Sequence, residues 1–321
     1  MSKADSANDN AQSQHAILEK VLQESITEQR RARRWRIFFR FFYAAIILLV
    51  ILLLQPEHSK DYYNRSVPHT SVVRITGPIM ANTRANAEDI NESLDDAFDD
   101  KNTTALMLII NSPGGSPVQA GQVYDHLRYL RKKHPKVKTY AVCTDACASG
   151  AYYIAAGADQ IFADQASLVG SIGVLMNGFG FVDTLQKLGV QRRLLTAGSE
   201  KGFLDPFSPM KPKDEAYAQT MLDTIHKQFI HAVEQGRGKR LQKHNPLLYS
   251  GLAWTGEQAL PLGLVDGLGS PDYVARSVIG NDKKVDYTTS EGLLQRLATN
   301  MGTSMGKSIS SSLGLHVGVV E

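Results

Sequence analysis

Residues 105–115 read Ala-Leu-Met-Leu-Ile-Ile-Asn-Ser-Pro-Gly-Gly. The six consecutive apolar residues at 105–110 have the length of one β-strand, and the absence of polar alternation is typical of a strand covered on both faces. Pro113, Gly114 and Gly115 then favour a tight turn directly after the strand. A strand of this kind belongs in a parallel sheet between layers of helices, so the stretch predicts an α/β fold.

The sequence on either side alternates between strand and helix patterns. Short apolar runs predict further strands at residues 71–75, 138–143, 161–163 and 264–266. Apolar or small residues at helical spacing predict helices at residues 84–99, 118–133, 148–156, 213–236 and 271–279. Strands that alternate with helices form βαβ units, so we expect the sheet to be mostly parallel.

The composition supports a globular domain and argues against nucleic acid as a partner. The chain has 321 residues, of which 43% are hydrophobic, and this is enough for a full core. Residues 1–40 hold eight Lys and Arg against five Asp and Glu, so this stretch accounts for the whole net charge of +3. The remaining residues balance to zero, so the charge gives no support for a nucleic-acid surface on the main domain.

A single transmembrane helix, an uncleaved signal anchor, is expected at residues 37–54. As a helix these residues would extend roughly 27 Å, close to the hydrocarbon thickness of a bilayer. Arg40 lies near one end, where its side chain can reach the lipid headgroups. A cleaved signal peptide would have a shorter apolar stretch, and the core helix of a soluble domain rarely carries so many large apolar residues in a row.

The arginines before this segment predict its orientation and the organisation of the chain. Five arginines lie between residues 30 and 36, whereas the residues after the span carry mixed charge. The positive-inside rule then places residues 1–36 in the cytoplasm as a polar arm and the rest outside it, in the periplasm against the inner membrane. Residues 55–70 are expected to be a linker, residues 71–285 the folded domain, and residues 286–321 a flexible C-terminal tail.

Ser149 is the first candidate for a chemical role. It follows a predicted strand and opens a predicted helix, where free N–H groups and the helix dipole would stabilise an alkoxide. Serine is also a common helix cap, so Ser149 alone leaves a structural role open. The loop at 111–115 likewise follows a strand, and its glycines can direct main-chain N–H groups into a cleft at the carboxyl edge of the sheet.

A nucleophilic serine needs a base, and Lys201 is a better candidate than any histidine. None of the nine histidines lies in an apolar or Gly-rich turn, although a Ser-His-Asp triad stays open. Lys201 has apolar and Gly neighbours, and a lysine can act as a base where burial lowers its pKa by roughly 3 units. Glu200 opposes this role, because a neighbouring carboxylate favours a charged lysine. Ser171, in Val-Gly-Ser-Ile-Gly-Val, is a candidate to orient the amine.

Four motifs together resemble the S49 serine peptidases, the signal peptide peptidase A family. They are Asn-Ser-Pro-Gly-Gly at 111–115, Ala-Ser-Gly-Ala-Tyr-Tyr-Ile-Ala at 148–155, Val-Gly-Ser-Ile-Gly-Val at 169–174 and Ala-Gly-Ser-Glu-Lys at 197–201. Their order and spacing are those of the family, and the resemblance covers roughly residues 70–285.

The resemblance implies a ClpP/crotonase-like fold and a Ser/Lys dyad. It assigns Ser149 as nucleophile, Lys201 as general base and Ser171 as the residue that orients the lysine. It assigns the N–H groups of Gly114 and Gly150 as the donors of the oxyanion hole.

The resemblance also implies partners and substrates. The chain is similar to the short family members with one catalytic unit, which are membrane-anchored homo-oligomers arranged as a dome. Each protomer of this type would supply its own dyad. The implied activity is that of a serine endopeptidase, and the implied substrates are signal-peptide remnants and other hydrophobic peptides, cleaved through an acyl-enzyme.

The remaining features are weighed against other classes. Cys143 and Cys147 are too few for a disulfide scaffold and fit no common zinc pattern, so we expect small buried residues, with a local disulfide as the alternative. No metal and no cofactor is expected. Two other functions stay open: a crotonase-like enzyme that acts on CoA thioesters, and a non-catalytic oligomeric scaffold.

Overall fold

The computed structural model describes residues 28, 30, 31, 33–49 and 65–289. The chain divides into two compact units, Met1–Ser59 and Lys60–Glu321.

Residues 33–49, in the first unit, form a helix whose side chains are all exposed. Trp35 stacks on Phe39 with ring centroids 5.5 Å apart, as residues four apart on a helix can. Within the described residues, no helix combines the length and the apolar character that a membrane crossing needs. The predicted span at 37–54 continues into residues 50–54, which lie outside the described residues, as does most of the predicted arm at 1–36. Both stay predictions.

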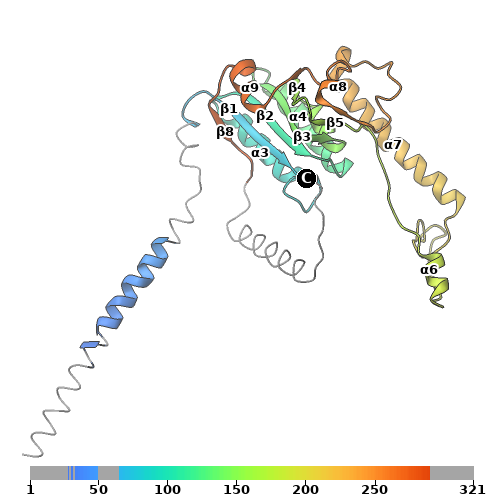
Figure 1. The fold of residues 1–321 in the computed structure, drawn as a ribbon, viewed down its shortest axis with the longest axis horizontal. Helices are drawn as coiled ribbons and strands as arrows, with labels where there is room; N and C mark the ends of the chain where they lie inside the picture. Colours follow the sequence, from blue (N-terminus) through green and yellow to red (C-terminus); the bar gives the residue numbers. More distant parts are fainter. Residues whose placement is uncertain (1–27, 29, 32, 50–64, 290–321) are drawn as a thin grey trace, which may run out of the picture. The chain divides into compact units, whose positions relative to one another are not determined.

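The second unit is built on one sheet with the strand order β6-β5-β3-β2-β1-β8, in which β4 also pairs with β3 and with β7 (Figure 1). The strands are β1 (His69–Thr76), β2 (Thr103–Ser112), β3 (Lys138–Ala148), β4 (Gln160–Ala163), β5 (Leu168–Gly170), β6 (Ala253–Thr255), β7 (Gly267–Leu268) and β8 (Lys284–Asp286). The pairs are parallel except for β5 with β6, which is antiparallel. The predicted α/β fold with a mostly parallel sheet is therefore confirmed.

Helices connect the strands. They are α3 (Ala87–Asp99), α4 (Pro117–Lys133), α5 (Gly150–Ala155), α6 (Val182–Lys187), α7 (Pro212–Arg237), α8 (Gly256–Ala259) and α9 (Pro271–Tyr273), with a 3₁₀ turn at Gly238–Arg240 and a π-helical turn at Val274–Ile279. Local sequence fixes several of their starts. Asn86 accepts the Asp89 N–H at 2.9 Å before α3, and Ser116 caps α4, whose first residue is Pro117.

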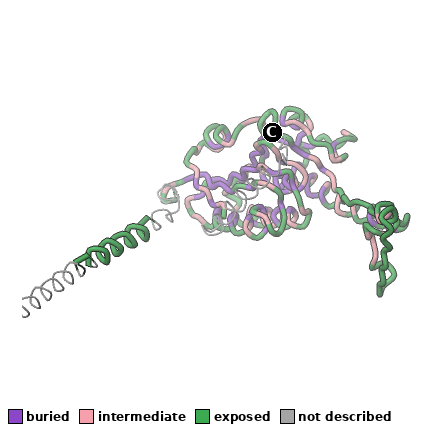
Figure 2. The backbone as a smooth tube through the Cα atoms, turned by 60° about the horizontal axis from the view of Figure 1, so that its bottom comes forward, coloured by how far each residue is buried: buried purple, intermediate pink, exposed green. Residues whose placement is uncertain are grey.

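The central strand β2 is buried on both faces, as its sequence predicts. Leu106 and Leu108 belong to the large core cluster with side chains of α3, α4 and α5, whereas Met107 and Ile109 pack with residues of the turn at 274–279. Alternate residues of a strand point to opposite faces, so one strand contributes to both layers. Figure 2 shows the buried residues gathered in this sheet.

Some predicted boundaries differ from the structure. The strand predicted at 264–266 is wrong, because strand β7 begins only at Gly267. Leu264 and Val265 are buried in the core without pairing in the sheet, while the Asp266 N–H donates to the Ile161 carbonyl at 2.7 Å.

The edges of the folded domain also extend beyond the sequence estimate. Strand β1 begins at His69, inside the expected linker at 55–70. At the other end, the Tyr287 N–H donates to the Val72 carbonyl at 2.8 Å, and its hydroxyl donates to Asp100 at 2.6 Å. Residues 286–289 of the expected tail therefore pack on the domain, and residues 290–321 lie outside the described residues.

A buried ion pair holds the C-terminal end of α7. Arg237 is 1% exposed, and its guanidinium donates to both oxygens of Asp266, at 2.7 and 3.0 Å. Its Nε also donates to the Gly263 carbonyl at 2.8 Å, and Asp266 accepts the Ile161 N–H of β4 at 2.7 Å. Because each polar group finds a partner, the pair links α7, β4 and the loop at 263–266.

The charge of this cluster sets the pKa of the Asp266 carboxyl. Burial raises this pKa, but the hydrogen bonds and charge of Arg237, the Ile161 N–H and the charge of Arg240 outweigh burial and hold the pKa below its ordinary value. A carboxylate with a lowered pKa in the folded state stabilises the protein above its unfolded-state pKa, and this contribution is lost as the pH falls through the folded-state value.

Replacement of Asp266 by Asn should lower the free energy of unfolding by about 3 kcal/mol at pH 7, because it leaves Arg237 buried without a counter-charge. The wild-type protein should lose stability as the pH drops below about 4, and the variant should lack this part of the loss. Urea unfolding at a series of pH values measures both effects. An unchanged acid dependence in Asp266→Asn would contradict this account of the pair.

Candidate active site

Ser149 lies in a sharp turn between β3 and α5. Its backbone has φ 53° and ψ −124°, a region that residues other than glycine rarely adopt. Hydrogen bonds on both sides hold the turn: the Ser149 N–H donates to the Gly170 carbonyl at 2.8 Å, and the Tyr153 N–H donates to the Ser149 carbonyl at 3.0 Å. Strained turns of this kind persist where the surroundings fix them, and they are concentrated at functional sites.

The Ser149 hydroxyl does not cap its own helix. Ser149 occupies the N-cap position of α5, yet its side chain makes no capping hydrogen bond. It instead lines a cavity of about 1140 Å³. The sequence left open a role for Ser149 as a helix cap, and in the structure its side chain does not have that role.

The glycine loop after β2 packs directly on this turn. Gly114 has φ 94°, and a Cβ at this position would lie 2.6 Å from the Ala148 carbonyl oxygen and 2.7 Å from the Gly150 nitrogen. Only glycine allows such an approach without displacing the main chain. The structure thus brings the predicted residues Gly114, Ser149 and Gly150 together.

The N–H groups of Gly114 and Gly115 have different surroundings in the structure. The Gly114 N–H, predicted as an oxyanion donor, donates to the Ser112 hydroxyl at 3.1 Å. The next residue, Gly115, lines the cavity together with Ser149 and Gly150. Gly115 was missed because either glycine of a Gly-Gly pair can turn its N–H into a cleft, and sequence spacing does not separate them.

Ser171 lies beside Ser149 because the strands before them are paired. Ala148 at the end of β3 is opposite Gly170 at the end of β5, so the next residue of each strand enters the same cavity. The Ser171 hydroxyl donates to the Gly251 carbonyl at 3.1 Å, and its main-chain N–H donates to the Leu252 carbonyl at 2.9 Å. Its oxygen lone pairs are therefore available to an amine.

An aromatic wall closes one side of the cavity. Tyr153 stacks on Phe229 of α7 with ring centroids 4.9 Å apart, and Tyr124 of α4 lies 5.3 Å from Tyr153. All three residues line the cavity. Large apolar walls with a few polar groups are typical of a site that binds a ligand with apolar side chains.

Lys201 lies in a different part of the structure. It belongs to residues 174–211, here named the extended loop, which leave the sheet after β5, include α6 and end at the start of α7 (Figure 1). Figure 2 shows most of this loop as exposed. Lys201 is exposed and is not among the residues that line the Ser149 cavity. The pairing of Ser149 with Lys201 stays a prediction.

The carboxylate next to Lys201 is engaged elsewhere. Glu200 accepts a hydrogen bond from Lys213 of α7, with 2.6 Å between Oε1 and Nζ. This bond, together with the charge of Lys213, lowers the pKa of the Glu200 carboxyl and outweighs the opposing effect of desolvation. The objection that Glu200 would hold Lys201 in its charged form is weakened, because Lys213 balances its charge.

One histidine does reach the cavity. His231 of α7 lines it, and its Nε2 lies 2.7 Å from the Gln235 Nε2. The sequence did not predict His231 as a residue of the site, because it lies in a polar helix. Whether a residue of this helix lines the cavity depends on how α7 packs against the sheet.

The two cysteines are buried and free. This confirms the expectation of small buried residues. Burial, together with a contact to Cys143, raises the pKa of the Cys147 thiol well above its ordinary value. A thiol that stays protonated is a poor nucleophile, so Cys147 does not compete with Ser149 for a catalytic role.

Comparison with known proteins assigns the chain to a family. The model for peptidase family S49 matches residues 131–286, and the model for Clp protease matches residues 55–168. A candidate protease of Synechocystis sp. is 32% identical over 247 residues, which cover 72% of this chain and 86% of that protein. The chain belongs to peptidase family S49. Within S49 it is of the signal peptide peptidase A type, since a candidate signal peptide peptidase SppA of Enterococcus faecium is 29% identical over 193 residues, 60% of this chain and 55% of that protein.

A longer relative shares the same region. A protein of Brucella abortus named as the Na(+)/H(+) antiporter NhaA is 40% identical over 253 residues, 77% of this chain and 34% of that protein. The S49 chain thus spans about a third of the length of this relative. The Clp protease match agrees with the mostly parallel sheet.

The strain at Ser149 gives a stability prediction. Ser149→Gly should be more stable than Ser149→Ala by roughly 1 kcal/mol, because glycine adopts φ 53° without steric cost whereas alanine does not. Both variants lack the hydroxyl, so lost side-chain contacts are nearly the same in the two. Thermal or urea unfolding of the pair measures the difference, and equal stability would mean that the turn is not strained in solution.

Proposed function

We propose that the chain is a membrane-anchored serine endopeptidase that cleaves signal-peptide remnants and other hydrophobic peptides. The observation that carries this proposal is the strained turn at Ser149, a residue that lines a cavity together with Gly115 and Gly150. Membership of family S49 supports the same chemistry. The exposed apolar helix at 33–49 supports attachment to a membrane.

In the proposed reaction the Ser149 hydroxyl attacks the peptide carbonyl and the amine of Lys201 takes its proton. The N–H groups of Gly150 and Gly115 stabilise the oxyanion, with Gly114 holding the turn in place. The Lys201 ammonium then gives its proton to the leaving amine. Water hydrolyses the acyl-enzyme, with Lys201 again as the base, and Ser171 accepts a hydrogen bond from the lysine and so orients it.

We further propose that Lys201 reaches Ser149 in a homo-oligomer, from the extended loop of a neighbouring copy. This differs from the expectation of one complete dyad per protomer. Two observations support it: Lys201 does not line the Ser149 cavity, and the extended loop exposes large apolar side chains, among them Leu195 at 97% and Leu175 at 82%. Such surfaces usually mark contacts with another chain.

Variants of the three candidate groups test the chemistry. Ser149→Ala should abolish labelling by a fluorophosphonate, and Lys201→Ala should lower kcat for an apolar peptide by about 10³-fold or more, because the serine loses its base. His231→Ala should change kcat by less than about tenfold. If His231→Ala is inactive while Lys201→Ala retains activity, the base is the histidine.

A mixture of inactive variants tests the origin of the lysine. Ser149→Ala and Lys201→Ala, unfolded and refolded together in equal amounts, should regain about a quarter of the wild-type activity if each site takes its serine and lysine from different copies. Each variant refolded alone is the control. No recovery, in an oligomer of normal size, would assign both residues of a site to one copy.

The other functions have less support. No observation favours a CoA thioester enzyme or a non-catalytic scaffold over a peptidase, and the Ser149 turn has no purpose in either. Thioester turnover that survives Ser149→Ala would favour the first, and a folded oligomer without cleavage of any peptide in a broad library would favour the second.

A further inference from the structure

Ser171 occupies a second strained turn, beside the one at Ser149. Its backbone has φ 50°, a value that residues other than glycine rarely adopt. The Gly173 N–H donates to the Ser171 carbonyl at 2.9 Å, so the chain reverses tightly about Ile172. Ser171 and Gly173 both line the Ser149 cavity. The direction of the Ser171 hydroxyl therefore depends on what holds residues 171–173, here named the Ser171 turn.

The loop at 250–252 holds one side of the Ser171 turn. The main-chain N–H and the hydroxyl of Ser171 donate to the carbonyls of Leu252 and Gly251. A Cβ on Gly173 would lie 2.8 Å from the Gly251 Cα, so the two main chains are in direct contact. None of these contacts uses the carbonyl of Ile172.

A histidine of α7 holds the other side of the turn. The His226 Nε2 lies 3.0 Å from the Ile172 carbonyl oxygen. Because a carbonyl oxygen only accepts, the hydrogen is on Nε2 and the histidine donates it. The Ile172 side chain packs in the large core cluster, so this residue is held by its side chain and by its carbonyl. His226 itself is half-buried and does not line the Ser149 cavity, whereas its neighbour Ile225 does.

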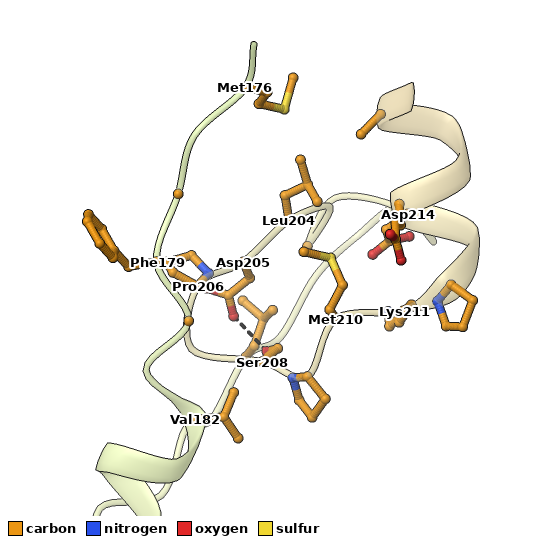
Figure 3. A pocket seen from close by; sticks show the side chains of 18 of the residues that line it. Met176, Phe179, Val182, Leu204, Asp205, Pro206, Ser208, Met210, Lys211 and Asp214 are labelled. Carbon is orange, nitrogen blue, oxygen red and sulfur yellow. Dashed lines mark hydrogen bonds between the residues drawn. The ribbon is translucent and has the colours of Figure 1, made fainter. Parts of the chain in front are cut away.

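The same hydrogen bond attaches the middle of α7 to the domain. The C-terminal part of the helix is held by the ion pair of Arg237. The start of the helix lies against the extended loop around a second cavity, of about 1090 Å³, with Leu204 and Met210 on its wall (Figure 3). Within the described chain, no side chain of residues 219–228 is buried, and their other hydrogen bonds stay inside the helix. The position of the middle of α7 relative to the Ser171 turn therefore depends on His226.

We propose that His226 is a positioning residue for the reaction. Its hydrogen bond to Ile172 holds the Ser171 turn in the strained form that directs the Ser171 hydroxyl to the amine of Lys201. The inference rests on the proposed peptidase function, in which Ser171 orients this lysine. A neutral imidazole with its hydrogen on Nε2 is sufficient for this role, since the bond needs a donor and no charge.

Loss of this bond should lower kcat and leave KM nearly unchanged. A strained backbone persists only where its surroundings fix it, so the Ser171 turn would relax and displace the hydroxyl. A displacement of about 1 Å in a catalytic arrangement can cost up to about 10²-fold in rate. Phe229 is buried and stacks on Tyr153, so the wall of the cavity that would contact the substrate should stay in place.

Two variants of His226 separate the hydrogen bond from the shape of the side chain. In His226→Gln the amide nitrogen lies as many bonds from the Cα as the histidine Nε2 does, whereas His226→Met has the same length without a donor. Both residues are good helix formers. With an apolar peptide, His226→Met should lower kcat about tenfold with KM within about twofold of wild type, and His226→Gln should retain at least about half of kcat.

Lys227→Met is the matched control. Lys227 is the exposed neighbour of His226 on α7 and lines neither cavity, so its replacement should change neither kcat nor KM. His226→Asn is a second variant without the bond, because its donor lies nearer the main chain. It should behave like His226→Met and takes its place if the methionine variant does not fold.

A double-mutant cycle shows whether His226 acts through Ser171. In a Ser171→Ala background, His226→Met should lower kcat by less than about twofold, because the hydroxyl that the turn orients is already absent. Where cleavage is too slow to follow, the rate at which a fluorophosphonate labels Ser149 replaces kcat in the cycle.

The proposal is overturned if His226→Met retains full activity, if Ser171→Ala does so, or if His226→Met costs the same tenfold in the Ser171→Ala background. Equal loss of kcat in His226→Gln and His226→Met would also overturn it and would assign the imidazole a part in proton transfer, since glutamine does not titrate. Failure of the proposed function is a separate result, because it shows as full peptide cleavage by Ser149→Ala with His226 in place.

Discussion

The ion pair between Arg237 and Asp266 is the constraint on which the rest of the site depends. It fixes the C-terminal end of α7 against the first residues of β4. α7 forms one wall of the Ser149 cavity, so a shift at its anchored end would displace Phe229 from Tyr153 and change the width of this cavity. A hydrophobic pair at this position would hold the helix in place without fixing its rotation as tightly, because the bidentate contact defines a direction as well as a distance.

The residues of the proposed active site fall into two groups: those fixed in position by the sheet, and Lys201 on the extended loop. Ser149, Ser171 and the glycine loop lie at the ends of adjacent parallel strands, where sheet pairing and main-chain hydrogen bonds set their positions before any substrate binds. Lys201 is carried by the extended loop, whose conformation depends on few contacts with the sheet. In the proposed reaction, the nucleophile and the oxyanion donors are held in place before the substrate binds, and Lys201 is supplied separately. The strained turn can then exist in a stable domain, while completion of the proposed dyad depends on a second event.

The sequence predicted those features that depend on local pattern. The apolar run at 105–110 predicts a central strand because burial on both faces leaves no polar alternation. The small residues at 148–156 predict the helix that follows Ser149, observed as α5. Strands β5, β6 and β8 were missed, since three residues carry no period, and they form only because longer neighbours offer free edges. His231 and Gly115 were missed for a related reason: which side of a helix or a glycine pair faces a cavity is decided by packing between distant segments.

The location of Lys201 has a different cause. The motif around it specifies a tight turn, in which the Lys201 N–H donates to the Gly198 carbonyl at 3.2 Å, but no local signal states where that turn lies relative to the sheet. The residues before and after it have no apolar period that would predict docking on a particular face. The order of the motifs along the chain therefore identified the peptidase family, but it did not predict where the motifs lie in the fold.

Two segments of the extended loop lack main-chain hydrogen bonds, and this affects how easily the loop can become ordered on binding. Within the described chain, no N–H group of residues 174–180 or 191–197 donates a main-chain hydrogen bond. Rearranging these segments breaks no hydrogen bonds between strands of the sheet. The free-energy cost of ordering them is therefore mainly a loss of conformational entropy, which grows with each residue that becomes ordered. Their amide hydrogens should exchange with solvent almost as fast as in an unstructured peptide, and whatever orders the loop, a bound peptide or a second chain, would slow that exchange without altering the core beneath.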